Sequence, residues 1–228
     1  MKNSRTISYA ASFGDAVFEN EDLDTLKSRL KNFKAISVRE STNLELIKEN
    51  VDVLVQRVLD PTLLFTKKEY EVITEKRLID EPYILLYARR YNKAMEEYAD
   101  KLAKEMNCKV VEISLRATNA DRHIMFYEAG VEEFLSLVKN AEYVVTNSFH
   151  GVIFSAIMNT QFSVFSREQA DTKIDELLDS LNLSERKMIT GKEKIDSGID
   201  FLKVDEILEN KRKESINYLI KALEIVEE

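Results

Sequence analysis

The stretch Ala141-Glu-Tyr-Val-Val-Thr-Asn-Ser-Phe-His150-Gly-Val-Ile-Phe-Ser-Ala156 changes from a strand pattern to a helix pattern. The β-rich run 143–146 ends at Asn147, and an apolar, helix-compatible run from 149 to 158 follows without room for a long loop. This order predicts that Ser148 caps the helix and that His150 lies in its first turn. Open α/β sheets bind ligands at the carboxyl ends of their strands, and helix N-termini favour anions. The stretch therefore predicts an anion-binding site.

Strand-like and helix-like segments alternate along the rest of the chain. We expect strands at 6–10, 35–38, 51–59, 83–87, 109–113, 142–146 and 161–165, and helices at 20–30, 41–48, 91–106, 131–139, 149–158, 172–181 and 203–226. The near-continuous apolar run 83–87 is typical of a parallel strand that is covered on both faces. The alternation predicts an α/β protein with Rossmann-like parallel sheets.

The pattern restarts after a polar segment, which predicts two domains. We expect residues 1–66 to form the later part of an N-terminal Rossmann-like domain, 67–81 a linker, and 82–228 a C-terminal Rossmann-like domain with a terminal helix. The first domain begins abruptly at a strand and is predicted to be incomplete, so we expect either a partner chain or oligomer, or a missing N-terminal segment, to cover its edge. The terminal helix is expected to bury one stripe, made of Ile207, Leu208, Ile216, Leu219, Ile220 and Leu223.

The composition favours a protein with a substantial core and excludes several classes of function. The 228 residues carry a net charge of −8, which disfavours nucleic-acid binding as a main role. No apolar run is long enough to span a bilayer, and the N-terminus has no signal-peptide pattern. The single cysteine excludes an internal disulfide and cannot build a zinc site by itself. We expect a cytoplasmic protein without a metal site.

Cations follow several of the expected strands. Arg39 follows 35–38, Arg89 follows 83–87, and Arg167 and Lys173 follow 161–165. A guanidinium binds carboxylate or phosphate through two parallel hydrogen bonds. Each of these cations also fits a solvated loop, and Arg39 also fits an ion pair with Glu40 or another nearby acid.

The two histidines lead to different expectations. A bound phosphate or carboxylate would favour the protonated form of His150, which then can act as a general acid. Gly151 would let another group approach the helix start closely. The residues alone equally fit a helix cap at Ser148 and a structural His150. By contrast, His123 lies in a polar loop without an apparent partner and is expected at the surface.

Several blocks of the sequence, taken in order, resemble the polysaccharide pyruvyl transferase family. They are 7–14, 36–40, 58–64, 83–87, 132–135 and Val145-Thr-Asn-Ser-Phe-His-Gly151, continued by 175–178, 181–183 and Arg186. The resemblance implies two Rossmann-like domains arranged as in GT-B glycosyltransferases. It also implies transfer of a pyruvyl group from phosphoenolpyruvate to a sugar or lipid-linked oligosaccharide of a cell-surface polysaccharide, without a separate cofactor. The strand and Asn-Tyr-Gly-type loop with which family members usually begin are not found before Lys2.

The resemblance also assigns roles to the candidate residues. His150 would be the acid or the phosphate ligand of the donor site, and Arg39 would hold an anionic group of the donor. Lys173, or else Arg167, would complete the pocket, with Ser148 and the Gly151 amide nearby. Arg89 is a further substrate-binding candidate.

Two other functions remain open at this stage. One is a GT-B glycosyltransferase that uses a nucleotide sugar, although no glycine loop for pyrophosphate and no ribose-binding acid follow Tyr87. The other is a non-catalytic, truncated relative that binds an anion or a partner chain.

Overall fold

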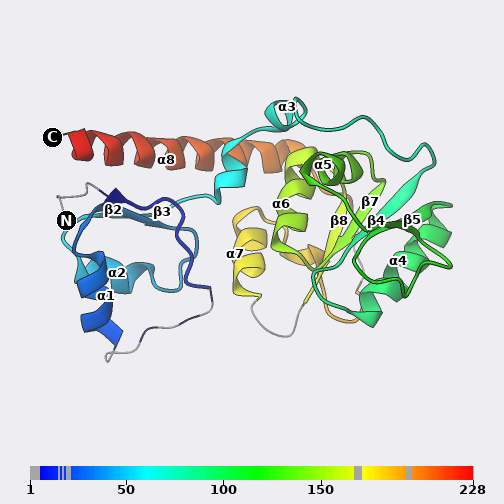
Figure 1. Ribbon diagram of the computed structural model, residues 1–228, viewed down its shortest axis with the longest axis horizontal. Helices are drawn as coiled ribbons and strands as arrows, with labels where there is room; N and C mark the ends of the chain where they lie inside the picture. Colours follow the sequence, from blue (N-terminus) through cyan, green and yellow to red (C-terminus); the bar gives the residue numbers. More distant parts are fainter. Residues whose placement is uncertain are drawn as a thin grey trace. The chain divides into compact units, whose positions relative to one another are not determined.

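The computed structural model describes residues 6–14, 16, 18, 22–166, 171–193 and 197–227, and the chain divides into two compact units (Figure 1). The first unit comprises Met1–Leu64 and Glu206–Glu228, and the second comprises Phe65–Asp205. Each unit contains one sheet whose paired strands all run parallel. The predicted Rossmann-like α/β fold is confirmed.

The sheet of the first unit is covered by helices on both faces (Figure 1). Its strands, in sheet order, are β1 (Thr6–Ile7), β2 (Phe33–Val38) and β3 (Leu54–Arg57), and its helices are α1 (Leu23–Leu30), α2 (Leu44–Asn50) and part of α8 (Phe201–Glu227). Successive residues of β2 point to opposite faces. Ile36 and Val38 pack with Leu26 and Ile47, whereas Ala35 packs on the α8 side.

The predicted buried stripe of α8 is confirmed at Leu208 and in part at Leu219, but it differs at three other positions. Ile216, Ile220 and Leu223 are 44%, 50% and 53% exposed. The buried positions of this helix within the first unit are Leu208, Ser215, Tyr218 and Ala222. Small side chains let the helix approach the sheet, and polar ones bond to it: the Tyr218 hydroxyl donates to the Ser8 carbonyl (2.8 Å), and the Leu59 amide donates to Ser215 Oγ (3.0 Å). Residues 206–228 therefore belong to the first unit, whereas the sequence assigned the whole helix to the second domain.

The sheet of the second unit has the strand order β6-β5-β4-β7-β8-β9. The strands are β4 (Tyr83–Tyr87), β5 (Lys109–Ile113), β6 (Ile124–Phe126), β7 (Tyr143–Thr146), β8 (Phe162–Phe165) and β9 (Lys187–Met188). With β4 counted as the first strand, this is the Rossmann order 3-2-1-4-5-6. The order reverses between β4 and β7, and such switch points are where open α/β sheets bind ligands. The two short strands β6 and β9 were not predicted.

Helices cover both faces of this second sheet (Figure 1). They are α4 (Lys93–Glu105), α5 (Val131–Lys139), α6 (Phe149–Met158) and α7 (Thr172–Ser180), with the single turn α3 (Lys67–Tyr70) ahead of them. Ile84 and Leu86 of β4 pack in one cluster with Met95 and Ala99 of α4. On the other face, the Tyr83 hydroxyl donates to a main-chain carbonyl of α5 at 2.9 Å. The apolar run 83–87 is thus buried on both faces, as predicted.

The segment predicted to be a linker, 67–81, packs within the second unit. Lys67 Nζ donates to the Met158 carbonyl at the end of α6 (2.8 Å). Ser136 Oγ of α5 donates to the Lys76 carbonyl (2.8 Å). These bonds tie the polar segment to the α5–α6 face of the sheet. As for membrane spans, none of the helices in the described ranges combines the length and the apolar character needed to cross a bilayer.

Candidate functional site

The turn from β7 to α6 has the predicted form. Ser148 is the N-cap residue with extended backbone (φ −103°, ψ 133°), and its carbonyl accepts the first helical bond from the Val152 amide (3.1 Å). The Ser148 amide donates to Thr146 Oγ1 (3.0 Å), and Thr146 Oγ1 donates to the Tyr87 carbonyl of β4 (2.7 Å). Thr146 therefore fixes the start of α6 to the end of the neighbouring strand.

The Ser148 side chain makes no capping bond. Ser148 is 4% exposed, and within the described ranges no hydrogen bond involves its Oγ. The amides of the first helical turn have no acceptor within the helix, and they carry the positive end of the helix dipole. The helix start thus combines amide donors with a hydroxyl that is available to a ligand, which is the chemistry of an anion site.

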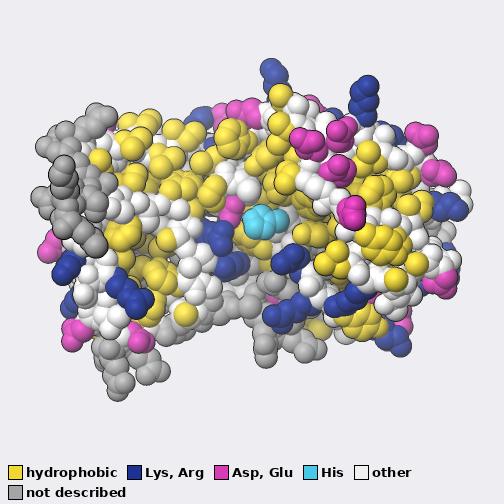
Figure 2. Space-filling view, viewed as in Figure 1, with side chains coloured by type: hydrophobic (Ala, Val, Ile, Leu, Met, Phe, Trp, Pro, Cys, Tyr) yellow, Lys and Arg dark blue, Asp and Glu magenta, His cyan; other side chains and the backbone are white. Residues whose placement is uncertain are grey.

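His150 lies in the first turn of α6 and is exposed. A histidine side chain reaches the surface drawn in Figure 2. The ring of His150 is T-shaped to that of Phe149, with centroids 5.5 Å apart. An exposed imidazole in the first turn can meet a ligand that binds to the helix amides.

Gly151 permits a close approach, but the group that approaches belongs to the fold. A Cβ atom built on Gly151 would lie 3.0 Å from both Cβ and Cγ2 of Thr146, and nearer still to Thr146 Oγ1. The absence of a side chain at Gly151 therefore lets α6 sit against the end of β7. Whether its amide also binds substrate stays a prediction.

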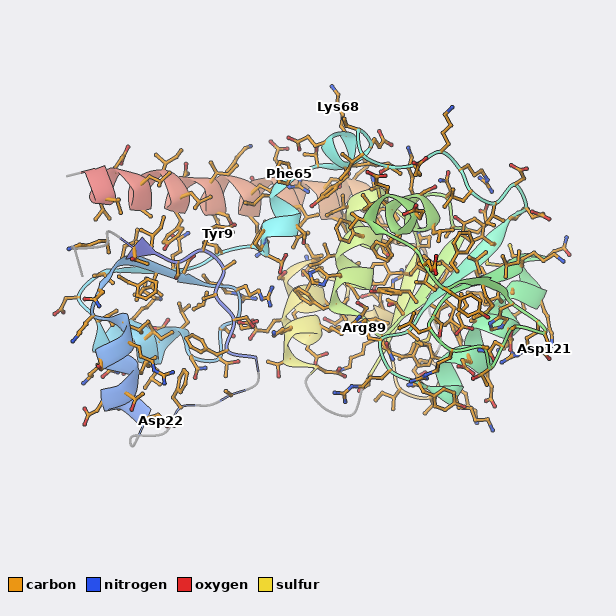
Figure 3. The ribbon with its side chains drawn as sticks, viewed as in Figure 1. Tyr9, Asp22, Phe65, Lys68, Arg89 and Asp121 are labelled. Atoms are coloured by element: carbon orange, nitrogen blue, oxygen red, sulfur yellow. The ribbon has the colours of Figure 1, made fainter. Side chains whose placement is uncertain are left out.

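Arg89 lies at the switch point, on the loop that follows β4 (labelled in Figure 3). Its side chain is exposed. The main chain of this loop is bonded to Asn147: the Arg89 amide donates to Asn147 Oδ1, and Asn147 Nδ2 donates to the Arg90 carbonyl, both at 2.8 Å. Asn147 is 1% exposed. Sequence reasoning placed Asn147 at the end of the strand but missed these bonds, because they depend on which strands are neighbours.

The residues after β8 include a carboxylate as well as the predicted cations. Ser166 Oγ donates to Asp171, the N-cap residue of α7 (2.6 Å), and the Asp171 carboxylate lies 3.4 Å from Lys187 Nζ. Lys173 is the second residue of α7 and is half-buried. Arg167 lies outside the described residues. The predicted roles of Arg167 and Lys173 stay predictions.

Arg39, in the first unit, is held by two carboxylates. Its Nε lies 3.2 Å from Glu40 Oε1, and its Nη1 pairs with Asp60. Burial raises the pKa of Asp60, but hydrogen bonds from Thr62 and Arg39 outweigh burial and hold that pKa below its ordinary value. The ion pair that the sequence left open is thus present. Asp60 also forms a turn, since its Oδ1 accepts from the Thr62 amide (3.0 Å).

His123 is not at the surface, contrary to expectation. Its side chain is 1% exposed and lies between two carboxylates, with Nδ1 at 2.7 Å from Glu112 Oε2 and Nε2 at 2.8 Å from Asp100 Oδ1. Asn119 Nδ2 also donates to Glu112 (2.8 Å), and Arg122 pairs with Asp100. The polar loop before β6 folds back onto α4 and β5, which the local sequence did not reveal.

The buried cluster around His123 makes the free energy of unfolding depend on pH in the acidic range. Burial raises the pKa of Glu112, but the hydrogen bonds from His123 and Asn119 outweigh burial and lower that pKa from 4.5. A lowered carboxyl pKa contributes stability above the unfolded-state value, and this contribution is lost as the pH falls through the folded-state value. We expect the free energy of unfolding, measured with urea from pH 6 to pH 3, to fall more steeply below about pH 4.5 in the wild type than in Glu112→Gln. The exposed Glu142→Gln variant should follow the wild type. Parallel curves for all three proteins would contradict the assignment.

Within the described ranges, no group of three or more His, Cys, Asp and Glu side chains is arranged to hold a metal ion. The donors at the switch point are instead amides, a hydroxyl, an imidazole and a guanidinium, which suit an anion.

Comparison with known families agrees with these observations. A family model described as polysaccharide pyruvyl transferase matches residues 1–169, which include the turn from β7 to α6 and the loop after β4. Lys173 lies outside the matched region. A comparison with curated proteins finds no match. Because the match covers most of its 228 residues, the chain belongs to the polysaccharide pyruvyl transferase family.

Proposed function

We propose that the chain transfers a pyruvyl group from phosphoenolpyruvate to a sugar of a cell-surface polysaccharide or of its precursor. The observation that carries the proposal is the switch point of the second sheet. There, the N-terminus of α6, the Ser148 hydroxyl and the exposed His150 follow β7, and Arg89 follows the adjacent strand β4. Family membership supplies the reaction class.

Phosphoenolpyruvate has the chemistry that this arrangement suits. Its phosphate would accept hydrogen bonds from the first-turn amides of α6 and from Ser148 Oγ. An arginine on the neighbouring loop can pair with the carboxylate or the phosphate. The net charge of −8 does not oppose this, because a single anion responds to the few donors around it rather than to the whole surface.

The proposed role of His150 is that of a general acid. The protonated imidazole gives its proton to the methylene carbon of phosphoenolpyruvate, which makes the central carbon electrophilic. A sugar hydroxyl then forms a bond to that carbon, and the bond to the phosphate oxygen breaks. A second hydroxyl of the sugar closes the ketal. Of the two hydroxyl protons, one returns to the imidazole and the other leaves with the phosphate.

Two other predicted ligands need separate tests. Arg39 already contacts two carboxylates, so its availability to an anion depends on how strongly Glu40 and Asp60 retain it. Lys173 follows an N-cap aspartate, whose negative charge opposes anion binding at the start of α7. Both roles stay predictions, and we rank His150 and Arg89 above them.

Calorimetric titration with phosphoenolpyruvate tests the proposal. We expect the wild type to bind, and His150→Ala and Arg89→Ala each to bind about tenfold more weakly, which corresponds to about 1.4 kcal/mol. Lys109→Ala is a matched control. This exposed cation begins β5 and therefore lies at the amino-terminal ends of the strands, opposite the candidate site.

The outcomes separate the alternatives. Failure of the wild type to bind phosphoenolpyruvate would exclude the proposed donor, and binding of a nucleotide sugar instead would favour a glycosyltransferase. Equal binding by the wild type and His150→Ala would remove His150 from the donor site. Binding without release of phosphate in the presence of candidate acceptors would favour a non-catalytic protein.

A further inference from the structure

Asn147 uses both ends of its side-chain amide on one loop. Its Oδ1 accepts from the Arg89 amide, and its Nδ2 donates to the Arg90 carbonyl, both at 2.8 Å. An amide group has an acceptor end and a donor end, and each end makes one bond to the main chain of this loop. Asn147 itself is 1% exposed, so its side of each bond is shielded from water.

The bonds join the two sides of the switch point. Asn147 directly precedes the cap of α6, and Arg89 and Arg90 belong to the loop between β4 and α4. The loop has a second attachment at Asn92, which accepts from the Met95 amide at 3.0 Å and caps α4. The exposed side chain of Arg89 therefore projects from the stretch of main chain that Asn147 holds in place.

We infer that Asn147 is a positioning residue of the donor site, which sets the loop that carries Arg89 against the N-terminus of α6. This inference rests on the proposed function for its effect on binding. In this inference Asn147 acts through the loop, since both of the bonds that its amide makes are to main-chain groups of that loop. Its loss would let the loop move and would remove the partners of the Arg89 amide and the Arg90 carbonyl.

Two variants test the inference by calorimetry. Asn147→Ala should bind phosphoenolpyruvate about tenfold more weakly than the wild type, because donors that are not held in place bind with less free energy. Asn147→Asp should bind more weakly still at pH 8. The introduced carboxylate keeps the acceptor for the Arg89 amide, but it repels the Arg90 carbonyl and places a negative charge beside an anion site.

The pH dependence of Asn147→Asp separates positioning from a general structural role. Burial disfavours the charged form of the introduced carboxyl, so it should take up a proton above the usual aspartate value of about 4. The neutral carboxyl can donate to the Arg90 carbonyl and accept from the Arg89 amide, as the asparagine does. The ratio of the variant Kd to the wild-type Kd should therefore fall from pH 8 to pH 5. The ratio cancels the protonation of phosphoenolpyruvate itself, which is the same in both measurements.

Hydrogen exchange supplies a readout that needs no donor. The Arg89 amide should be protected in the wild type and should exchange at least tenfold faster in Asn147→Ala, with amides in β8 unchanged as a check on folding. Asn140→Ala is a matched control. This asparagine also uses its amide on the main chain, donating to the Ser136 carbonyl at 2.9 Å, but it lies at the end of α5.

The results distinguish failure of the inference from failure of the proposed function. If the wild type binds phosphoenolpyruvate and both Asn147 variants bind equally well, the inference is wrong and the proposed donor stands. If the wild type does not bind it, the proposed donor is wrong and the effect on binding falls with it. An Arg89 amide that exchanges equally fast in the wild type and in Asn147→Ala would overturn the attachment itself.

Discussion

Replacing His123 with alanine is expected to lower the free energy of unfolding by about 3–5 kcal/mol, which is the usual cost of leaving a buried carboxylate without its partner. The side chain is 1% exposed, and each ring nitrogen faces a carboxylate oxygen within 2.8 Å. The variant would leave Glu112, which is 4% exposed, without its imidazole partner and would open a cavity beside it. Urea denaturation near pH 7 measures the loss.

A second substitution tests whether the uncompensated charge causes this loss. Adding Glu112→Gln to His123→Ala removes the buried carboxylate, so the double variant should recover part of the stability. Asp121→Ala is a control, since this residue is exposed on the same loop (Figure 3). A fall of less than 1 kcal/mol in the free energy of unfolding of His123→Ala would show that the cluster contributes little to stability. The folded fraction of His123→Ala should bind phosphoenolpyruvate as the wild type does, because the cluster is structural.

The parts of the fold that the sequence predicted are those with strong local patterns. β4, β5, α5 and α6 have the predicted bounds, since an apolar run or a regular periodicity marks each of them. β6 and β9 have three and two residues and carry no such pattern. Pairing with a neighbouring strand makes them strands, and the local sequence does not encode that pairing.

The errors at α8 and His123 have a common physical cause. On α8, Ser215 and Ala222 are buried because they are small enough for close packing, whereas Ile216, Ile220 and Leu223, which hydrophobicity placed on the buried face, are exposed. At His123, a polar loop is buried because Glu112 and Asp100, 11 and 23 residues away along the chain, supply its partners. Both outcomes depend on tertiary neighbours.

The candidate site was predictable in its position and its helix cap, and less so in its bonding. The change of pattern at Asn147 placed Ser148 and His150 correctly at the start of a helix. The roles of Thr146 and Asn147 depend on β4 lying beside β7, which follows from the strand order. The partners of these two side chains are therefore set by the neighbouring strand in the sheet and not by the neighbouring residues in the sequence.

Replacing Gly151 with alanine tests how closely the start of α6 packs against the end of β7. The sign of the change in the free energy of unfolding is informative. In a helix without steric conflict, alanine would stabilise relative to glycine by about 1 kcal/mol. Here the added Cβ would lie 3.0 Å from two carbon atoms of Thr146 and nearer still to its Oγ1. We expect a net loss of about 1–3 kcal/mol in urea denaturation, which is typical of an overpacked core.

Thr146 cannot move aside without losing bonds of its own. Its Oγ1 donates to the Tyr87 carbonyl and accepts from the Ser148 amide, so a shift breaks the contact between α6 and β4. Gly151→Ala should therefore also weaken phosphoenolpyruvate binding, because it displaces the helix start that carries Ser148 and His150. Gly198→Ala is the matched control, since a Cβ there would meet its nearest neighbour at 3.5 Å, an ordinary contact. Stabilisation by Gly151→Ala would mean that the start of α6 can adjust. In that case the glycine would be explained by a need to admit a ligand to the helix amides, and not by the fold.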